Sequence, residues 1–256
     1  MNDDSWLAFA SDLAGAEVLS DSGSHSVAAH DLIFAVSDGM GGGNAGDVAS
    51  STLLERLTTI IPQTFKTAAS GLHPDYFTHL EDAIRSVHEK INAKAELDAN
   101  HKGMAATLAL AWFTPENLYL ANVGDSRIYL HRNGETSQLT LDHTFAWRKM
   151  SRGELSEREF RAHPRRSALY EVVGGGHNTV NSHVASIPFL AGDQFLICSD
   201  GLIDGLWDKH IHSAFLKNSS STSQLADSLM ERAATNDGSD DITLITIHVS
   251  NEAENS

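Results

Sequence analysis

The feature of this sequence that most constrains its fold is a succession of short apolar segments between residues 103 and 141. They are MAATLALAWF, NLYLANVGD, RIYLHRNG and ETSQLTL, and each has the length and composition of a β-strand. No helical segment separates them, and Asn133-Gly134 is a typical pair for the centre of a hairpin turn. Strands grouped in this way favour an α+β fold over a parallel sheet whose strands alternate with helices.

Predicted helices lie on both sides of this strand-rich region. Apolar residues at helical spacing predict helices over residues 45–61, 76–97, 208–216 and 223–234. Residues 145–162 are polar, basic and prone to form a helix. Further strands are predicted at residues 32–37, 180–187, 194–198 and 242–249.

No linker rich in proline or glycine divides the chain, so we predict one domain over residues 1–256, with a disordered polar tail at about residues 250–256. The first residues, MNDDSW, lack the basic and then apolar profile of a signal peptide. No apolar run reaches the roughly 20 residues that span a bilayer. The only cysteine, Cys198, excludes a disulfide framework and a cysteine-based zinc site. We therefore expect a cytoplasmic protein.

The chain is strongly acidic, with 34 Asp and Glu residues against 18 Lys and Arg residues and a formal net charge of -16. No Lys or Arg precedes Arg56. Such a charge repels nucleic acid and anionic membranes, so neither is expected as a partner. It also repels a phosphorylated ligand unless counter-cations neutralise part of the charge.

Aspartates recur at the ends of four predicted strands. The segments FAVSDGM and FLICSDGL place Asp38 and Asp200 between a strand and a glycine, and NLYLANVGD ends in Asp125. Asp240 and Asp241 directly precede the last predicted strand. An aspartate beside a glycine is a common turn, which explains each of them alone. Together they favour a cluster of carboxylates that binds hard divalent cations, Mg²⁺ or Mn²⁺.

Bound cations would explain why Asp38 stands before the glycine-rich turn GGGNAG, residues 41–46. Two such ions roughly 3.5–4 Å apart can lower the pKa of a shared water and orient a phosphoryl group for in-line attack. The same turn also matches the dinucleotide fingerprint G-x-G-x-x-G, but the position about 20 residues later, where that fold needs an acid, is Lys66. The match leaves a dinucleotide-binding oxidoreductase as a further alternative, and saturable binding of NAD(H) would be needed to support it.

Six motifs occur in order along the chain: AVSDGMGGGNAGDVAS, GMAATLALAW, LANVGDSRIYLHRNG, QLTLDHT, FLICSDGL and GSDDITLITI. Together they strongly resemble the metal-dependent Ser/Thr protein phosphatases, the PPM or type 2C family, in their bacterial form, from Trp6 to about Val249. The resemblance implies a four-layer α-β-β-α sandwich of two antiparallel sheets flanked by helices, with metals between the sheets at one end.

The resemblance also implies roles for the aspartates. Asp38 is expected to bridge two core cations, Mn²⁺ or Mg²⁺, and Gly39 to add its backbone carbonyl. Asp200 and Asp240 correspond to the remaining carboxylates of the first cation. Asp125, with Asp200, corresponds to a ligand of the weaker third cation of bacterial members.

One segment departs from the resemblance. The family's N-terminal signature is an arginine, which grips substrate phosphate, followed by Asn-Glu-Asp, in which an acid serves the second cation. Aligned with AEVLSDSG, residues 16–23, the signature places Asp21 at the glutamate and Glu17 or Ala16 at the arginine. Asp21 is then the expected ligand of the second cation. Asp241 replaces the family's asparagine after the last metal aspartate.

A basic segment at residues 144–167 resembles the mobile flap beside the family's site, although a solvated surface helix explains its composition equally well. Loss of the signature arginine would remove bidentate, charge-assisted bonds to phosphate. An arginine from later in the chain could replace it. The candidates are Arg127, Arg148, Arg152 and Arg165.

These inferences predict an enzyme that hydrolyses phosphoserine or phosphothreonine in proteins, through a water activated at Asp38, Asp200 and Asp240 and without a phosphoenzyme intermediate. Met40 stands where some relatives carry a histidine proposed as the general acid, so we assign no acid. The expected partners are phosphorylated substrates of a Ser/Thr kinase, or the kinase itself, and the protein is expected to be a monomer. The alternative, suggested by the degenerate N-terminal segment, is a catalytically weak, metal-binding relative that acts as a phosphoprotein-binding or regulatory module.

Overall fold

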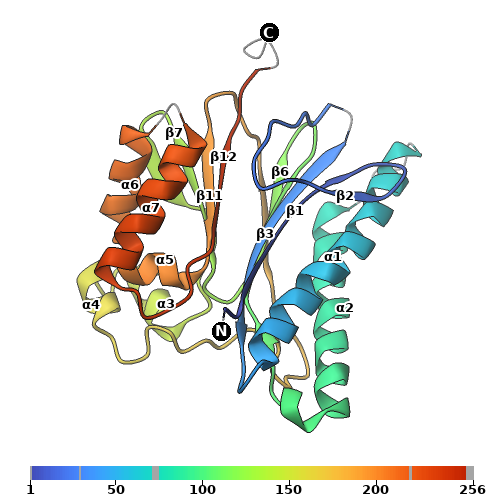
Figure 1. The fold of residues 1–256 in the computed structure, drawn as a ribbon, viewed down its shortest axis with the longest axis horizontal. Helices are drawn as coiled ribbons and strands as arrows, with labels where there is room; N and C mark the ends of the chain where they lie inside the picture. The colour runs from blue at the N-terminus through green and yellow to red at the C-terminus, as the bar shows by residue number, and fades with distance from the viewer. Residues whose placement is uncertain (1, 29, 71–74, 219–220, 252–256) are drawn as a thin grey trace.

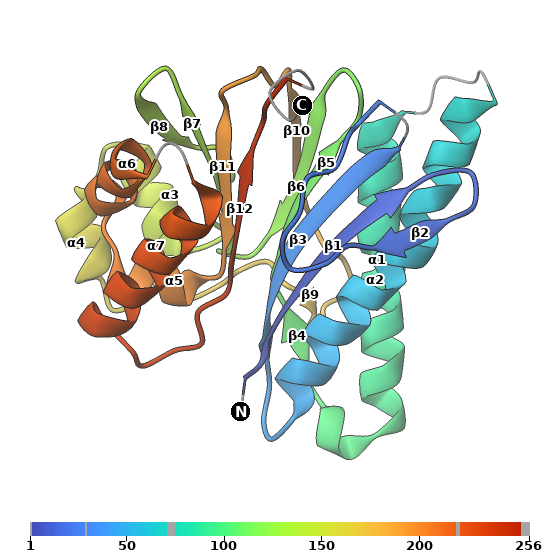
Figure 2. The same cartoon turned by 45° about the horizontal axis from the view of Figure 1, so that its top comes forward.

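The computed structural model describes residues 2–28, 30–70, 75–218 and 221–251. Two antiparallel sheets face each other, and helices cover the outer face of each sheet (Figure 1 and Figure 2). This arrangement confirms the predicted α+β fold. One sheet is covered by α1 (Ala45–Ala69) and α2 (Tyr76–Leu97), and the other by α5 (Asp200–Gly205), α6 (Asp208–Lys217) and α7 (Thr222–Asn236).

The first sheet has eight strands within the described residues. Its main path has the order β10-β6-β5-β3-β1-β2, while β4 pairs with β3 and with β9. Every pairing is antiparallel. The strands are β1 (Asp4–Ser11), β2 (Ala16–Val18), β3 (Asp31–Met40), β4 (Ala105–Ala106), β5 (Leu108–Phe113), β6 (Leu118–Val123), β9 (Val173–Gly174) and β10 (His183–Ile187).

The second sheet has the order β12-β11-β7-β8. Its β7–β8 hairpin turns at Asn133 and Gly134, whose φ angles of 53° and 79° fit the predicted two-residue turn. The predicted strand succession of residues 103–141 therefore forms, but it is divided between two sheets after β6. The strands are β7 (Arg127–Arg132), β8 (Glu135–Gln138), β11 (Gln194–Cys198) and β12 (Leu244–His248).

Three hydrophobic clusters hold the four layers together. One lies between the first sheet and α1 and α2, and includes Ile33, Leu57 and Trp112. A second lies between the two sheets, where apolar side chains such as Val36 and Phe195 meet. The third packs α5, α6 and α7 on the second sheet. Because β3 is buried on both faces, its sequence is a continuous apolar run and not an alternating one.

Some elements differ from the prediction. Helix α1 continues beyond residue 61 to Ala69 with Pro62 inside it, because Ile61 and Thr64 on either side of the proline stay buried. The basic segment forms two short helices, α3 (Phe145–Ser151) and α4 (Glu157–Arg161), divided at a capping box on Ser156. A short 3₁₀ helix, η1 (Ala99–His101), follows α2, which has the predicted bounds.

None of the helices in the described residues is long and apolar enough to cross a bilayer. Residues 252–256 of the predicted polar tail lie outside the described residues.

Candidate metal centre

The centre of the site is Asp38, near the end of β3. Its backbone is fixed by Thr107, whose Oγ1 accepts from the Asp38 N–H at 2.9 Å and whose N–H donates to the Asp38 carbonyl at 2.8 Å. In the β1–β3 register Asp38 lies opposite Asp4, and the two carboxyl groups share a hydrogen bond. The Ser199 hydroxyl donates to Asp4 Oδ2 at 2.7 Å and so fixes the Asp4 carboxyl group. The pair joins the start of β1 to the end of β3.

Two further predicted aspartates reach this place from the second sheet. Asp200 is the first residue of α5, directly after β11, and Asp240 lies in the loop before β12. Burial, and after it the charges of Asp200, Asp4 and Asp240, raises the pKa of Asp38 to about 8. Burial, and after it the charges of Asp240, Asp204 and Asp4, likewise raises the pKa of Asp200 to about 7. The carboxylates therefore repel one another across the gap between the sheets.

Asp125 lies where the chain crosses from the first sheet to the second. Gly124 makes the crossing with a φ of 93°, and a Cβ there would lie 2.6 Å from the Thr107 side chain, so only glycine fits. Asp125 is 8 % exposed, and burial raises its pKa well above the usual range, followed by the charges of Asp200, Asp142 and Asp38. The structure therefore brings four predicted residues together: Asp38, Asp125, Asp200 and Asp240.

Asp21 does not join this group. It is exposed after β2, and β1 separates β2 from β3. The register also excludes it, because Phe9 pairs with Val18, five residues along β1 from Asp4. From Val18 the chain runs on to Asp31, which starts β3 at the end far from Asp38. The structure therefore does not place Asp21 beside Asp38, as the second cation would require, and Asp4 lies beside Asp38 instead.

The N-terminal residues supply the acids that the prediction sought at residues 16–23. Asp3 N–H donates to Asp241 Oδ2 at 2.9 Å, and its carbonyl accepts from Gly39 N–H at 3.1 Å. The run Asn2-Asp3-Asp4 resembles the Asn-Glu-Asp of the signature, whereas residues 16–23, with Glu17 or Ala16 at its arginine, lie away from Asp38. The signal in the sequence was the run NDDS, whose position at Asp38 depends on the long-range pairing of β1 with β3.

The donors present fit hard divalent cations. Within the described residues, no three acidic, histidine or cysteine side chains already stand at metal-ligand spacing. A cation beside Asp38 and Asp200, whose pKa values are raised to about 8 and about 7, would favour their ionised forms at neutral pH. Asp3 Oδ1 is buried and accepts no hydrogen bond, so it is an orphaned oxygen beside the cluster. A Cβ at Gly39 would lie 2.1 Å from the Gly46 carbonyl, so the close backbone approach requires glycine.

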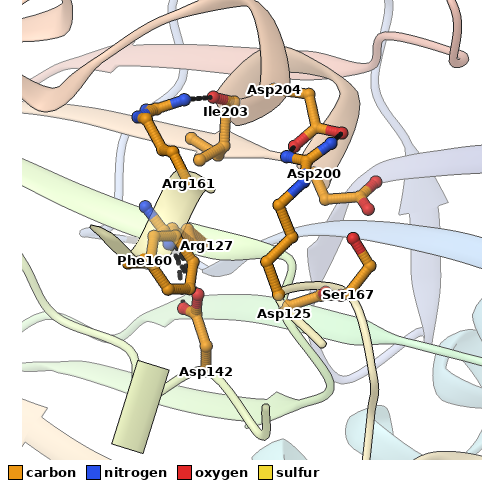
Figure 3. Close-up of a pocket in the computed structure, with 10 residues that line it drawn as sticks. Asp125, Arg127, Asp142, Phe160, Arg161, Ser167, Asp200, Ile203 and Asp204 are labelled. Carbon is orange, nitrogen blue, oxygen red and sulfur yellow. Dashed lines mark hydrogen bonds and ion pairs between the residues drawn. The ribbon is translucent and has the colours of Figure 1, made fainter. Parts of the chain in front are cut away.

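Arginines line the pocket next to Asp125 and Asp200 (Figure 3). Arg127 is 2 % exposed and makes a bidentate ion pair with Asp142, with its Nη2 2.6 Å from Asp142 Oδ2. This pairing removes Arg127 from the candidates for phosphate binding. The prediction missed Arg166, which pairs with Asp204 one helical turn after Asp200.

Comparison with known proteins assigns the chain and its fold to a family. The profile described as Protein phosphatase 2C matches residues 10–236. The chain belongs to this family. The predicted family resemblance and the predicted enzyme class, a protein phosphatase, are both confirmed.

Relatives of this phosphatase are similar over most of its length. The serine/threonine phosphatase stp of Listeria welshimeri is 34% identical over 216 residues, which is 84% of this chain and 83% of that protein. The crystal structure of the Mycobacterium tuberculosis serine/threonine phosphatase PstP/Ppp has 29% identity and a TM-score of 0.76, covering 97% of this chain and 99% of that chain. The catalytic domain of PstP in complex with two manganese ions has 28% identity and a TM-score of 0.72, covering 97% and 99% of the two chains.

Proposed function

We propose that this phosphatase hydrolyses phosphoserine and phosphothreonine in proteins by direct attack of water, without a phosphoenzyme intermediate. The observation that carries the proposal is the meeting of Asp4 and Asp38 from one sheet with Asp200 and Asp240 from the other. The names of the relatives support the substrate class, and a relative binds manganese. Mn²⁺ or Mg²⁺, when bound, would lower the pKa of a water and neutralise charge on the phosphoryl group.

Each residue of the site has a proposed role. Asp38, Asp200 and Asp240 would hold the core cations, with the Gly39 carbonyl and with Asp4 in the place predicted for Asp21. Asp125 and Asp200 would hold a third cation. Thr107 and Ser199 orient Asp38 and Asp4 by the hydrogen bonds described above. No side chain of the described residues is assigned as a general acid, so solvent is proposed to protonate the leaving alkoxide.

The substrates are proposed to be proteins phosphorylated by a Ser/Thr kinase. The phosphatase itself is proposed to be a monomer with one domain over residues 1–256. The contact of apolar side chains between the two sheets supports one domain. The alternative of a catalytically weak binding module was motivated by the degenerate residues 16–23. Asp3 and Asp4, which lie beside Asp241 and Asp38, weaken the part of that motivation that concerns the acids. The absence of Lys and Arg before Arg56 still supports the alternative, and a wild type that binds Mn²⁺ without turnover would favour it.

A matched pair of variants tests the assignment. We expect Asp4→Asn to lower Mn²⁺-dependent turnover of p-nitrophenyl phosphate and of a phosphothreonine peptide at least ten-fold (on the order of 1.4 kcal/mol or more). Asp21→Asn, which makes the same change at an exposed position, should leave turnover unchanged. Equal losses in the two variants, or a loss in Asp21→Asn alone, would contradict the placement of the site. No turnover of either substrate by the wild type would contradict the proposed function.

A further inference from the structure

The flap, defined here as residues 144–167, has a charge opposite to that of the rest of the protein. It contains seven of the 18 Lys and Arg residues and only three of the 34 Asp and Glu residues. The remainder of the chain therefore has 31 acids against 11 bases. Helices α3 and α4 of the flap lie at the end of the molecule where the chain begins, beside α5 (Figure 1). An acidic peptide is repelled by most of this surface and attracted by the flap.

Two of the three acids of the flap are engaged locally. Glu157 accepts from Arg161 Nε at 3.2 Å and from Asp208 N–H at 3.1 Å. Glu159 folds back onto Ser156 and accepts from its N–H at 2.8 Å and its hydroxyl at 2.7 Å. These contacts leave the exposed cations of the flap without an acid partner among the described residues. They are Arg148, Lys149, Arg152, Arg158 and Arg165.

Arg148 is held in place by aromatic rings. Its guanidinium lies 5.8 Å from the centroid of Phe145 and 5.7 Å from that of Tyr170, and the two rings are 5.4 Å apart. Contacts of this length are cation–π interactions, which fix a guanidinium without neutralising its charge. Because the side chain is already ordered, less conformational entropy is lost when it binds a carboxylate.

Backbone hydrogen bonds connect the segments that carry Arg148 and its two aromatic rings to the metal centre. His143 N–H donates to the Gly124 carbonyl at 2.8 Å, directly before Asp125, and Tyr170 N–H donates to the His143 carbonyl at 2.9 Å. Arg148 lies one helical turn beyond Thr144, a rise of about 6 Å along α3. An extended peptide advances about 3.3 Å per residue. Two to four residues of an extended peptide span about 7–13 Å, and we take this as the separation between a phosphate held by cations at Asp125 and Asp200 and an acid bound to Arg148.

We propose that Arg148, with its exposed neighbours Lys149 and Arg152, makes this phosphatase select phosphosites that are flanked by acidic residues two to four positions away. The proposal rests on the proposed function and adds its substrate class. An Asp or Glu of the substrate would bind the guanidinium between Phe145 and Tyr170, and the acidic remainder of the surface would disfavour any other docking of the same peptide.

The test is the ratio of kcat/KM for two phosphothreonine peptides of equal length in saturating Mn²⁺. One peptide carries Glu at the positions two to four residues from the phosphothreonine, and the other carries Gln there. We expect the wild type to prefer the acidic peptide about three- to ten-fold at low salt, since one exposed charge pair contributes about two- to five-fold. High salt should lower this ratio.

Variants test whether the preference for the acidic peptide comes from the cations of the flap or from the overall charge of the protein. Arg148→Gln should lower the ratio about two-fold or more, and Arg148→Gln with Lys149→Gln and Arg152→Gln should bring it to about one. Arg148→Lys keeps the charge and should retain most of the preference. Lys217→Gln, which removes an exposed cation at the end of α6, should leave the ratio of the wild type. Hydrolysis of both peptides at equal rates by the wild type would overturn the proposal and leave the proposed function standing; hydrolysis of neither would overturn the function itself.

Discussion

Asp31 introduces a carboxylate into the protein interior at the start of β3, far from the metal centre. It is 2 % exposed, and its Oδ2 accepts from Trp112 Nε1 at 2.9 Å. Burial raises its pKa to about 6 from an ordinary value of 3.8, and the bond from Trp112 opposes this only in part. The folded state therefore holds the proton to a higher pH than the unfolded state does. The resulting stabilisation is present below about pH 4 and is lost as the pH rises through about 6.

Asp31→Asn should stabilise the protein at pH 7.5, because the neutral amide oxygen can still accept from Trp112 without the burial of a charge. The gain in the free energy of unfolding is at most about 3 kcal/mol, and it should vanish near pH 4. Urea unfolding at the two pH values measures it. Asp21→Asn, which makes the same change on the surface, should show no such dependence. An Asp31→Asn variant less stable than the wild type at pH 7.5 would contradict the account.

Helix α4 of the flap contacts α5 through Arg161. Arg161 donates to the carbonyls of Ile203 and Leu206, at 2.7 and 2.5 Å, and its guanidinium lies 5.1 Å from the ring centroid of Trp207. A cation that binds the last carbonyls of α5 also interacts favourably with the helix dipole. Arg161 therefore attaches the flap to the helix that begins with Asp200.

Arg161→Ala should release α4 from α5 and make the flap more accessible to proteases. Limited trypsin digestion should cut between residues 148 and 166 several-fold faster than in the wild type, because the local opening loses about 1–3 kcal/mol of hydrogen bonds to a charged group. Arg158→Ala removes an exposed arginine of the same helix and serves as the matched control. Equal cleavage rates in the two variants would show that Arg161 does not hold the flap.

Among the helices, strands and turns, the sequence predicted those that a local sequence pattern specifies. Helix α2 has the predicted bounds, and the hairpin at Asn133-Gly134 forms as expected. The short helix α5 and the two-residue strands β4 and β9 lack a periodic signal. The placement of Asp4 beside Asp38 depends on the pairing of β1 with β3, which no local pattern specifies, and so Asp21 was chosen in its place.

Across the whole molecule, the two sheets are brought together at a place where their acids repel each other. Without a cation, the raised pKa values of Asp38, about 8, and Asp200, about 7, mean that protonation stabilises the folded state and that this stabilisation is lost as the pH rises through 7 to 8. Cations compete with protons for these carboxylates. We therefore expect bound cations to add to the hydrophobic contacts that already hold the two sheets together.

Mn²⁺ should raise the melting temperature more at pH 8 than at pH 6, and its binding at pH 6 should release protons. At about 100 times the dissociation constant, the stabilisation is about 2.7 kcal/mol. Thermal unfolding with Mn²⁺ and with a chelator at each pH measures the effect. An increase in melting temperature that is larger at pH 6 would contradict the proposed ligands.

The most direct test of the central claim is turnover of p-nitrophenyl phosphate, with and without Mn²⁺, by the wild type, Asp38→Asn and Asp31→Asn. The two variants each remove one carboxylate, from opposite ends of β3, and thermal unfolding confirms that each is folded. We predict that the wild type and Asp31→Asn require Mn²⁺ and turn over at similar rates, and that Asp38→Asn loses all but a few per cent of its activity. Substantial Mn²⁺-dependent turnover by a folded Asp38→Asn variant would contradict the claim that these aspartates form the catalytic metal centre.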